Sequence, residues 1–139
     1  MSVSPQPLSE ADERTWAMLA HLSVLANLIT GFLGPVAAIV IYAVYQERSR
    51  YVAYHAWQSF IFQLVWWVGG GIVVGLVWAI TGILSAILIG LLCIPIAFLF
   101  TLIPIAAVVY GVVGAIQVSQ GQDFKYWLTS DWSFVRDKA

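Results

Sequence analysis

Two histidines, His21 and His55, are the side chains of this sequence best suited to chemistry, because imidazole ligates metal ions, haem and chlorophyll-type pigments. Each lies in a long tract that contains no Asp, Glu, Lys or Arg. No Cys, Asp or Glu accompanies them at a spacing recognised for metal ligands. We therefore expect hydrogen-bonded histidines and no cofactor, with a haem or (bacterio)chlorophyll at His21 or His55 as the lesser alternative.

Further polar side chains accompany the histidines at helical spacing. His55 and Gln58 share one stripe of a helix, and Ser59 and Gln63 lie beside it. Groups of this kind lose hydrogen bonds to water when they enter lipid, so they should face protein, the headgroup layer or a wet cavity. The candidate intramembrane polar or partner-facing residues are His21, Ser23, Asn27, His55, Gln58 and Gln63.

The same tracts argue against catalysis. A proton relay or an aspartyl-type intramembrane protease needs carboxylates at depth, and the apolar tracts contain none. Ser59 is four residues from His55, but no third group or oxyanion motif accompanies this pair. We therefore expect a protein that is not an enzyme.

Composition points to the membrane. Of 139 residues, 61% are hydrophobic and 9% are charged, which leaves too little polar surface to coat a soluble globule. The formal net charge of −1 offers no basic surface for nucleic acid. Charged residues are absent between Arg14 and Glu47 and between Arg50 and Asp123. Since a crossing needs about 20 residues, the second tract holds at least two spans and the first holds one bent span or two short ones.

The first tract is predicted to form two short helices, over about Thr15–Ile29 and Pro35–Tyr45, joined by a turn at Gly31, Gly34 and Pro35. At roughly 22 and 16 Å, each is too short to cross upright. A single span broken in the middle is one geometry, and a re-entrant hairpin is the other. We favour the hairpin because it puts every Lys and Arg on one side, which is then cytoplasmic.

The second tract is predicted to hold two full transmembrane helices. The first begins within residues 50–63 and carries Gly71 and Gly75, a GxxxG pattern that favours close packing on another helix, with a simple kink as the alternative. The last covers about Ile96–Ser119 and ends near Gly121. The surplus between them, residues 79–96, is predicted to form tilted helix extensions or an interfacial turn on the far side, with Gly82, Gly90 and Pro95 as breakers; the exact turn is not located by the sequence.

The fold class is therefore an all-α integral membrane protein with four hydrophobic helices. Residues 1–13 form a disordered cytoplasmic N-terminus, although Ser9, with Asp12 and Glu13 after it, resembles a helix N-cap. Residues 14–122 form one transmembrane domain. Residues 123–139 form an amphipathic interfacial tail whose rings belong at the headgroups; these are Phe124, Tyr126, Trp127, Trp132 and Phe134. The expected location is the bacterial cytoplasmic membrane, multi-pass, with both termini cytoplasmic.

Four segments resemble a known family: RTWAMLAHLSVLANL, GFLGPVAAIVIY, YHAWQSFIFQ and VVGAIQVSQGQDFKYWLT. In this order they are similar to landmarks of the bacterial domain of unknown function 4870 family, which is distantly related to the Tic-20 component of chloroplast protein import. Its most telling feature is a histidine followed eight residues later by the glutamine of Phe-Gln, matched here by His55 and Gln63. The resemblance implies four helices with both termini cytoplasmic.

Three functions follow from these expectations. The first is a non-catalytic accessory or scaffold subunit that docks other membrane helices, through a membrane-protein partner or a second copy on the Gly-rich helix. The second is a Tic-20-like translocation or membrane insertion factor with a thinned groove for a client chain. The third is a haem or pigment binder. The lipid bilayer is a partner in each, and nucleic acid in none.

Overall fold

The computed structural model describes residues 4–127, and every regular element within that range is a helix. The chain begins with α1 (Glu10–Leu22), a 3₁₀ turn (Ser23–Leu25) and α2 (Ala26–Thr30), which together we call the first rod. After it come α3 (Leu33–Tyr45) and α4 (Arg50–Gln63), which a π-helical segment (Leu64–Gly69) joins to α5 (Gly70–Ser85). The last element is α6 (Ile89–Ser119). The expectation of an all-helical protein is confirmed for the described part of the chain.

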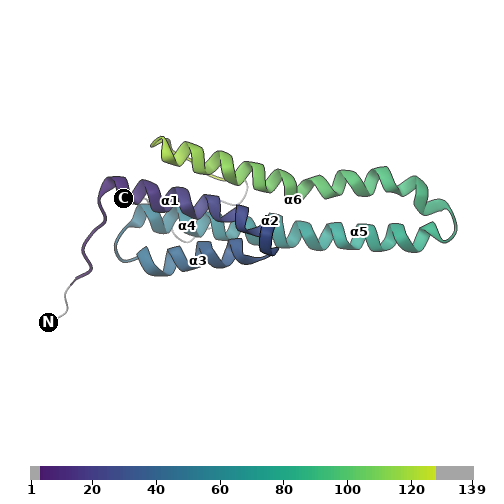
Figure 1. Cartoon of the computed structure of the whole chain (residues 1–139), viewed down its shortest axis with the longest axis horizontal. Helices are drawn as coiled ribbons and strands as arrows, with labels where there is room; N and C mark the ends of the chain where they lie inside the picture. The colour runs from purple at the N-terminus through teal and green to yellow at the C-terminus, as the bar shows by residue number, and fades with distance from the viewer. Residues whose placement is uncertain (1–3, 128–139) are drawn as a thin grey trace.

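The helices form two regions of different thickness (Figure 1). At one end α1, α2 and α3 fold back on themselves and pack on α4 and on the C-terminal part of α6. We call this the four-helix end, and it includes α6 from Ala107 onward. Beyond it, α5 and residues 89–106 of α6 continue alone as an antiparallel pair, which we call the two-helix arm.

Two helices are long and apolar enough to cross a membrane. They are the continuous rod Arg50–Ser85, of 36 residues, and α6, of 31 residues. At 1.5 Å per residue they measure about 54 and 46 Å, against a hydrocarbon core of about 30 Å. Helix α3 is a shorter apolar helix of 13 residues. Their exposed side chains are largely Leu, Ile, Val and Phe, as a lipid-facing surface requires. Both long helices therefore have the length, composition and exposure of membrane-spanning helices.

Capping chemistry sets both ends of the first rod. The Ser9 side chain accepts a hydrogen bond from the Asp12 N–H at 3.2 Å, which confirms the predicted N-cap. The helix begins at Glu10, so residues 10–13, expected in the disordered lead, are helical. At the other end Gly31 has a φ of +83°, a left-handed conformation that glycine adopts without strain. Helix α3 then begins at Leu33, two residues before Pro35.

The second turn lies near the middle of residues 79–96, the tract in which the sequence did not locate it. Helix α5 ends at Ser85 and α6 begins at Ile89, seven residues earlier than Ile96, the predicted start. Pro95 and Pro104 both lie inside α6. Gly90 allows the two helices to touch, because a Cβ there would overlap the backbone of α5 at Thr81 and Ser85. The tract is uncharged and its candidate breakers lie on both sides of the turn, so the sequence contains no signal that locates it.

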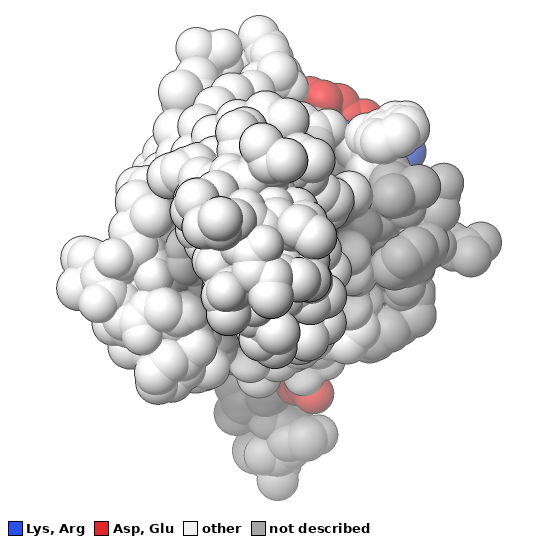
Figure 2. Space-filling model, turned by 90° about the vertical axis from the view of Figure 1, so that its right-hand side faces the viewer, with Lys and Arg blue, Asp and Glu red and all other residues white. Residues whose placement is uncertain are grey.

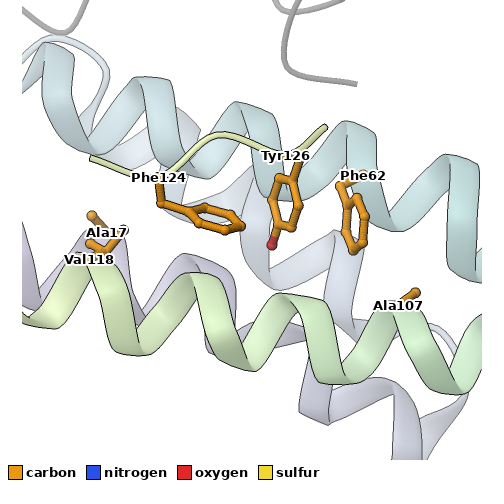
Figure 3. Close-up of a cluster of buried hydrophobic side chains, with 6 residues drawn as sticks. All are labelled: Ala17, Phe62, Ala107, Val118, Phe124 and Tyr126. Atoms are coloured by element: carbon orange, nitrogen blue, oxygen red, sulfur yellow. The ribbon is translucent and has the colours of Figure 1, made fainter. Parts of the chain in front are cut away.

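After α6, the chain reverses at Gly121 and residues 122–127 run back along the four-helix end. Phe124 and Tyr126 point between the helices (Figure 3). The buried cluster there consists of Ala17, Phe62, Ala107, Val118, Phe124 and Tyr126. The sequence placed Phe124 and Tyr126 at the headgroups; the structure buries them, and exposes Trp127. Residues 128–139, with Trp132 and Phe134, lie outside the described residues.

Candidate functional site

The polar residues selected from the sequence meet in one buried network at the four-helix end. They come from three segments that are distant in the chain: the first rod, α4 and the segment after α6. None is more than 9% exposed, and most are fully buried. The network contains His21, Ser23, Asn27, His55, Gln58, Ser59, Gln63 and Tyr126.

Gln63 connects α4 to the first rod. Its Nε2 donates to Ser23 Oγ at 2.9 Å and to Ser59 Oγ at 3.0 Å. Its Oε1 accepts from Asn27 Nδ2 at 2.9 Å. Both ends of the amide are therefore used, and the orientation of the side chain is fixed by three partners.

Asn27 extends the network to α3. Its Oδ1 accepts from the Gly34 backbone N–H at 2.8 Å, which satisfies one of the free amides at the start of α3. A Cβ at Gly34 would overlap the side chains of both Asn27 and Gln63. Gly34, predicted only as a turn residue, is therefore also the contact point at which α3 meets the network.

The two histidines lie at the other end of the network. His21 Nε2 lies 3.0 Å from His55 Nδ1, and His21 Nδ1 lies 2.8 Å from the Tyr126 hydroxyl. Two proton arrangements satisfy both bonds with neutral rings. Tyr126 can donate to His21 and His21 to His55, or the whole chain can run in reverse. The arrangement needs no charge, which suits its complete burial.

Tyr126 fastens the segment after α6 to α4. Its backbone N–H donates to Gln58 Oε1 at 3.2 Å, and its ring stacks on Phe62 with centroids 3.8 Å apart. Burial raises the pKa of the Tyr126 hydroxyl, so the phenol remains protonated. Sequence reasoning assigned Tyr126 to the interface and missed this role. No periodicity marks an isolated side chain in an irregular segment.

The hydrogen bonds of the network hold the helices of the four-helix end against one another. Within residues 4–127 no group of three His, Cys, Asp or Glu side chains could hold a metal ion. An apolar groove of about 360 Å³ lies beside the network, between α4 and α6, and its walls include Phe62, Tyr110 and Trp127. The groove exposes aromatic and aliphatic surface, whereas most polar atoms of the network are buried and bond to one another.

Gly71 and Gly75, by contrast, are exposed on α5 and contact no other described helix. A Cβ at either position would meet nothing within 4 Å. The close contacts inside the chain lie instead at Gly34, Gly90 and Gly111, which face another helical segment, and at Gly114, which faces Phe124. Docking of a partner helix on Gly71 and Gly75 stays a prediction.

Charged residues gather at the outer face of the four-helix end. Those described lie in the first turns of α1, in the α3–α4 connection and after α6, which Figure 1 shows together. Contacts join these segments: Ser49 Oγ donates to Glu13 Oε1 at 2.5 Å, and Arg48 Nε donates to the Gln6 carbonyl at 3.0 Å. We call this surface the charged face. Its charged members are Glu10, Asp12, Glu13, Arg14, Glu47, Arg48, Arg50, Asp123 and Lys125.

Comparison with known proteins gives one match. The model of the MamF/MmsF family, described as the magnetosome magnetite crystal formation protein family, matches residues 12–135. No curated protein and no solved structure matches the chain. The match overturns the resemblance to the domain of unknown function 4870 family and leaves the Tic-20-like function without support. The landmarks behind that resemblance include a Gly–Pro turn and polar groups between helices, which are common in packed membrane helices and do not identify one family.

Proposed function

The chain belongs to the magnetosome magnetite crystal formation protein family, and from this premise we propose that it is a small, non-catalytic protein of the magnetosome membrane that contributes to magnetite crystal formation. The observation that carries the proposal is the family match, which extends over residues 12–135 and therefore includes both long apolar helices and the whole buried network.

The geometry favours an accessory role over a chemical one. The network uses its polar atoms to hold the short first rod and α3 against α4, and the segment after α6 against both. This arrangement brings three separate charged segments onto one charged face beside the membrane. In the proposal this face is cytoplasmic, together with both termini, since cytoplasmic flanks collect Lys and Arg.

With the charged face in the cytoplasm, the chain acts on the crystal indirectly. The opposite end of the described structure carries no carboxylate that could bind a mineral (Figure 2). The chain then works by organising other membrane proteins of the magnetosome, through the charged face and the exposed side of α5. The first rod and α3 form the re-entrant hairpin that holds the charged face at the membrane surface.

A second candidate is direct contact with the mineral, and one observation favours it. Five of the nine charged residues of the charged face are Asp or Glu, whose oxygen ligands suit hard metal cations. This role requires the charged face to lie inside the magnetosome. The orientation of the chain therefore decides between the two candidates.

Deletion and orientation test the proposal together. The gene is deleted in its host and replaced by the wild type or by a Cys93→Ala, Gln122→Cys variant. Crystal size, shape and number are measured by electron microscopy. Isolated intact magnetosomes are treated with a membrane-impermeant maleimide. The proposal expects altered crystals on deletion, rescue by both chains, and labelling at position 122 without detergent.

Two results would count against it. Unchanged crystals after deletion would remove any role in crystal formation. Labelling of position 122 only after detergent would put the charged face inside the magnetosome, and so would replace the accessory role by mineral contact.

A further inference from the structure

The end of the two-helix arm is an unbroken aliphatic surface. Figure 2 looks onto it and shows uncharged atoms over the near face, with charged atoms only at the margins. Ile83 is 73% exposed, Leu88 73% and Leu92 80%. We call this surface the arm tip, and its residues are Ile83, Ile87, Leu88, Ile89 and Leu92. A loop that emerges into water would normally carry polar turn residues.

Several backbone N–H groups of the arm tip find partners within the chain, without water. In the turn, the N–H groups of Ala86, Ile87 and Leu88 donate to carbonyls of the last turn of α5 at 3.1 to 3.3 Å. The Ser85 hydroxyl donates to the Thr81 carbonyl at 2.8 Å. Lipid offers no hydrogen-bond partners, so these internal bonds lower the cost of placing the turn in it.

The backbone conformation of Leu88 is independent evidence that the surroundings of the arm tip are apolar. Three described residues have a positive φ, and two of them, Gly31 and Gly121, are glycines at the other turns. Leu88, with a φ of +64°, is the third. A left-handed leucine is strained, and glycine or asparagine would relieve that strain in an aqueous turn. An aliphatic side chain at this position is favourable where the surroundings are apolar.

The length of the arm is compatible with immersion. Helix α6 reaches about 46 Å when upright, and a tilt of about 40°, at the upper end of the usual range, reduces this to roughly 35 Å. Pro95 and Pro104 both lie inside α6, and proline favours helix bends, which would reduce it further. The turn then falls near the end of a hydrocarbon core of about 30 Å.

We propose that the arm tip is a lipid-binding surface that ends among the acyl chains of the far leaflet, so that no part of residues 51–122 reaches the compartment beyond. Acyl chains fit better than one partner helix. Exposed neighbours such as Leu91 and Leu92 point about 100° apart around α6. Lipid surrounds a helix pair on all such sides, whereas a single helix contacts one stripe.

Nitroxide accessibility tests this placement on the full chain. Cys93 is replaced by Ala, and single cysteines are introduced as Leu88→Cys at the arm tip, Leu102→Cys on the exposed mid-part of α6, and Gln122→Cys at the charged face. Each variant is spin-labelled and reconstituted in phosphatidylcholine–phosphatidylglycerol vesicles. Collision with oxygen, which concentrates in lipid, is compared with collision with a water-soluble nickel chelate.

The expected result is that the label at position 88 resembles the label at position 102, with a ratio of oxygen to nickel collisions several-fold higher than at position 122. Nickel access at position 88 equal to that at 122 would put the arm tip in water and overturn the proposal. Exclusion of both reagents would also overturn it, because protein, in this preparation a second copy, would then cover the arm tip. If Leu88→Cys does not fold, Ile87→Cys tests the same surface.

Discussion

The four-helix end and the two-helix arm are built from the same kind of apolar helix, yet they are held together differently. In the four-helix end, side-chain hydrogen bonds link the first rod to α4 and to the segment after α6, and one joins it to the backbone of α3. In the arm, the hydroxyls of Thr81, Ser85 and Thr101 donate to the backbone of their own helices. The described side-chain bond between α5 and α6 is Trp78 Nε1 to Thr101 Oγ1, at 3.0 Å.

This difference shows how short helices remain attached inside a membrane. Lipid is as apolar as leucine, so burial of leucine gives helices little reason to associate there. Two long helices that each satisfy their own backbone hydrogen bonds can remain in the membrane despite this weak attraction. The uncharged part of the first rod, residues 15–30, and α3 are each shorter than a full membrane span, and the buried network supplies the missing attachment.

Loss of the Gln63 amide is expected to have the largest effect. Gln63→Leu keeps the volume but leaves Asn27 Nδ2, Ser23 and Ser59 without their Gln63 partner, all of them buried. We expect the free energy of unfolding to fall by about 3 kcal/mol, since each unsatisfied buried group costs about 1–3 kcal/mol. It is measured by titrating the protein with sodium dodecyl sulfate in mixed micelles.

The matched control is Thr101→Val in the arm, which removes the acceptor of one bond from Trp78. Its expected cost is no more than about 1 kcal/mol. The double variant Gln63→Leu, Asn27→Leu sharpens the result. Asn27→Leu should cost less free energy in the Gln63→Leu protein than in the wild type, because its partner is already absent. Equal costs for Gln63→Leu and Thr101→Val would remove the contrast between the two regions.

Gly114→Ala is expected to loosen the segment after α6. A Cβ at Gly114 would lie 2.6 Å from the Phe124 ring, so that ring and the segment that carries it must move. We expect a loss of about 2 kcal/mol, as for other overpacked cores, and faster proteolysis after Lys125 by trypsin. The same substitution at Gly82 in the arm meets nothing within 4 Å and serves as the control. Similar proteolysis of both variants would mean that Phe124 is not held by this contact.

Tyr126→Phe removes one hydroxyl and keeps the stack on Phe62. His21 Nδ1 loses its partner at 2.8 Å, and the expected cost is about 1 kcal/mol. Tyr110→Phe is the control, because its hydroxyl accepts from the backbone N–H of the exposed Trp127. In the same titration, a larger loss of unfolding free energy for Tyr110→Phe than for Tyr126→Phe would contradict the role assigned to the bond between His21 and Tyr126.

Sequence reasoning selected polar residues of the first rod and α4 that the structure brings together, but it did not predict which groups they bond to. Helical spacing identified the polar stripes of the first rod and α4, because a polar group deep in an apolar tract needs a protein partner wherever the helix packs. It did not find Tyr126, since the position of a side chain in an irregular segment depends on where that segment packs. It also could not locate the turn at 86–88, because the tract is uncharged and its candidate breakers, Gly82, Gly90 and Pro95, lie on both sides of the turn.

Gly71→Ala is the smallest change and tests what the arm contacts. A Cβ there meets nothing within the chain, and alanine favours a helix over glycine, so unfolding free energy should be unchanged or rise by up to about 1 kcal/mol. The measurement is the same titration, repeated at several ratios of protein to detergent. If Gly71 and Gly75 pack on a second copy, the added methyl group instead lowers the stability, and the loss grows with protein concentration. A loss of stability that does not depend on protein concentration would mean that Gly71 packs on another part of the same chain. That result would contradict the arrangement in which α5 contacts α6 and has lipid on its remaining sides.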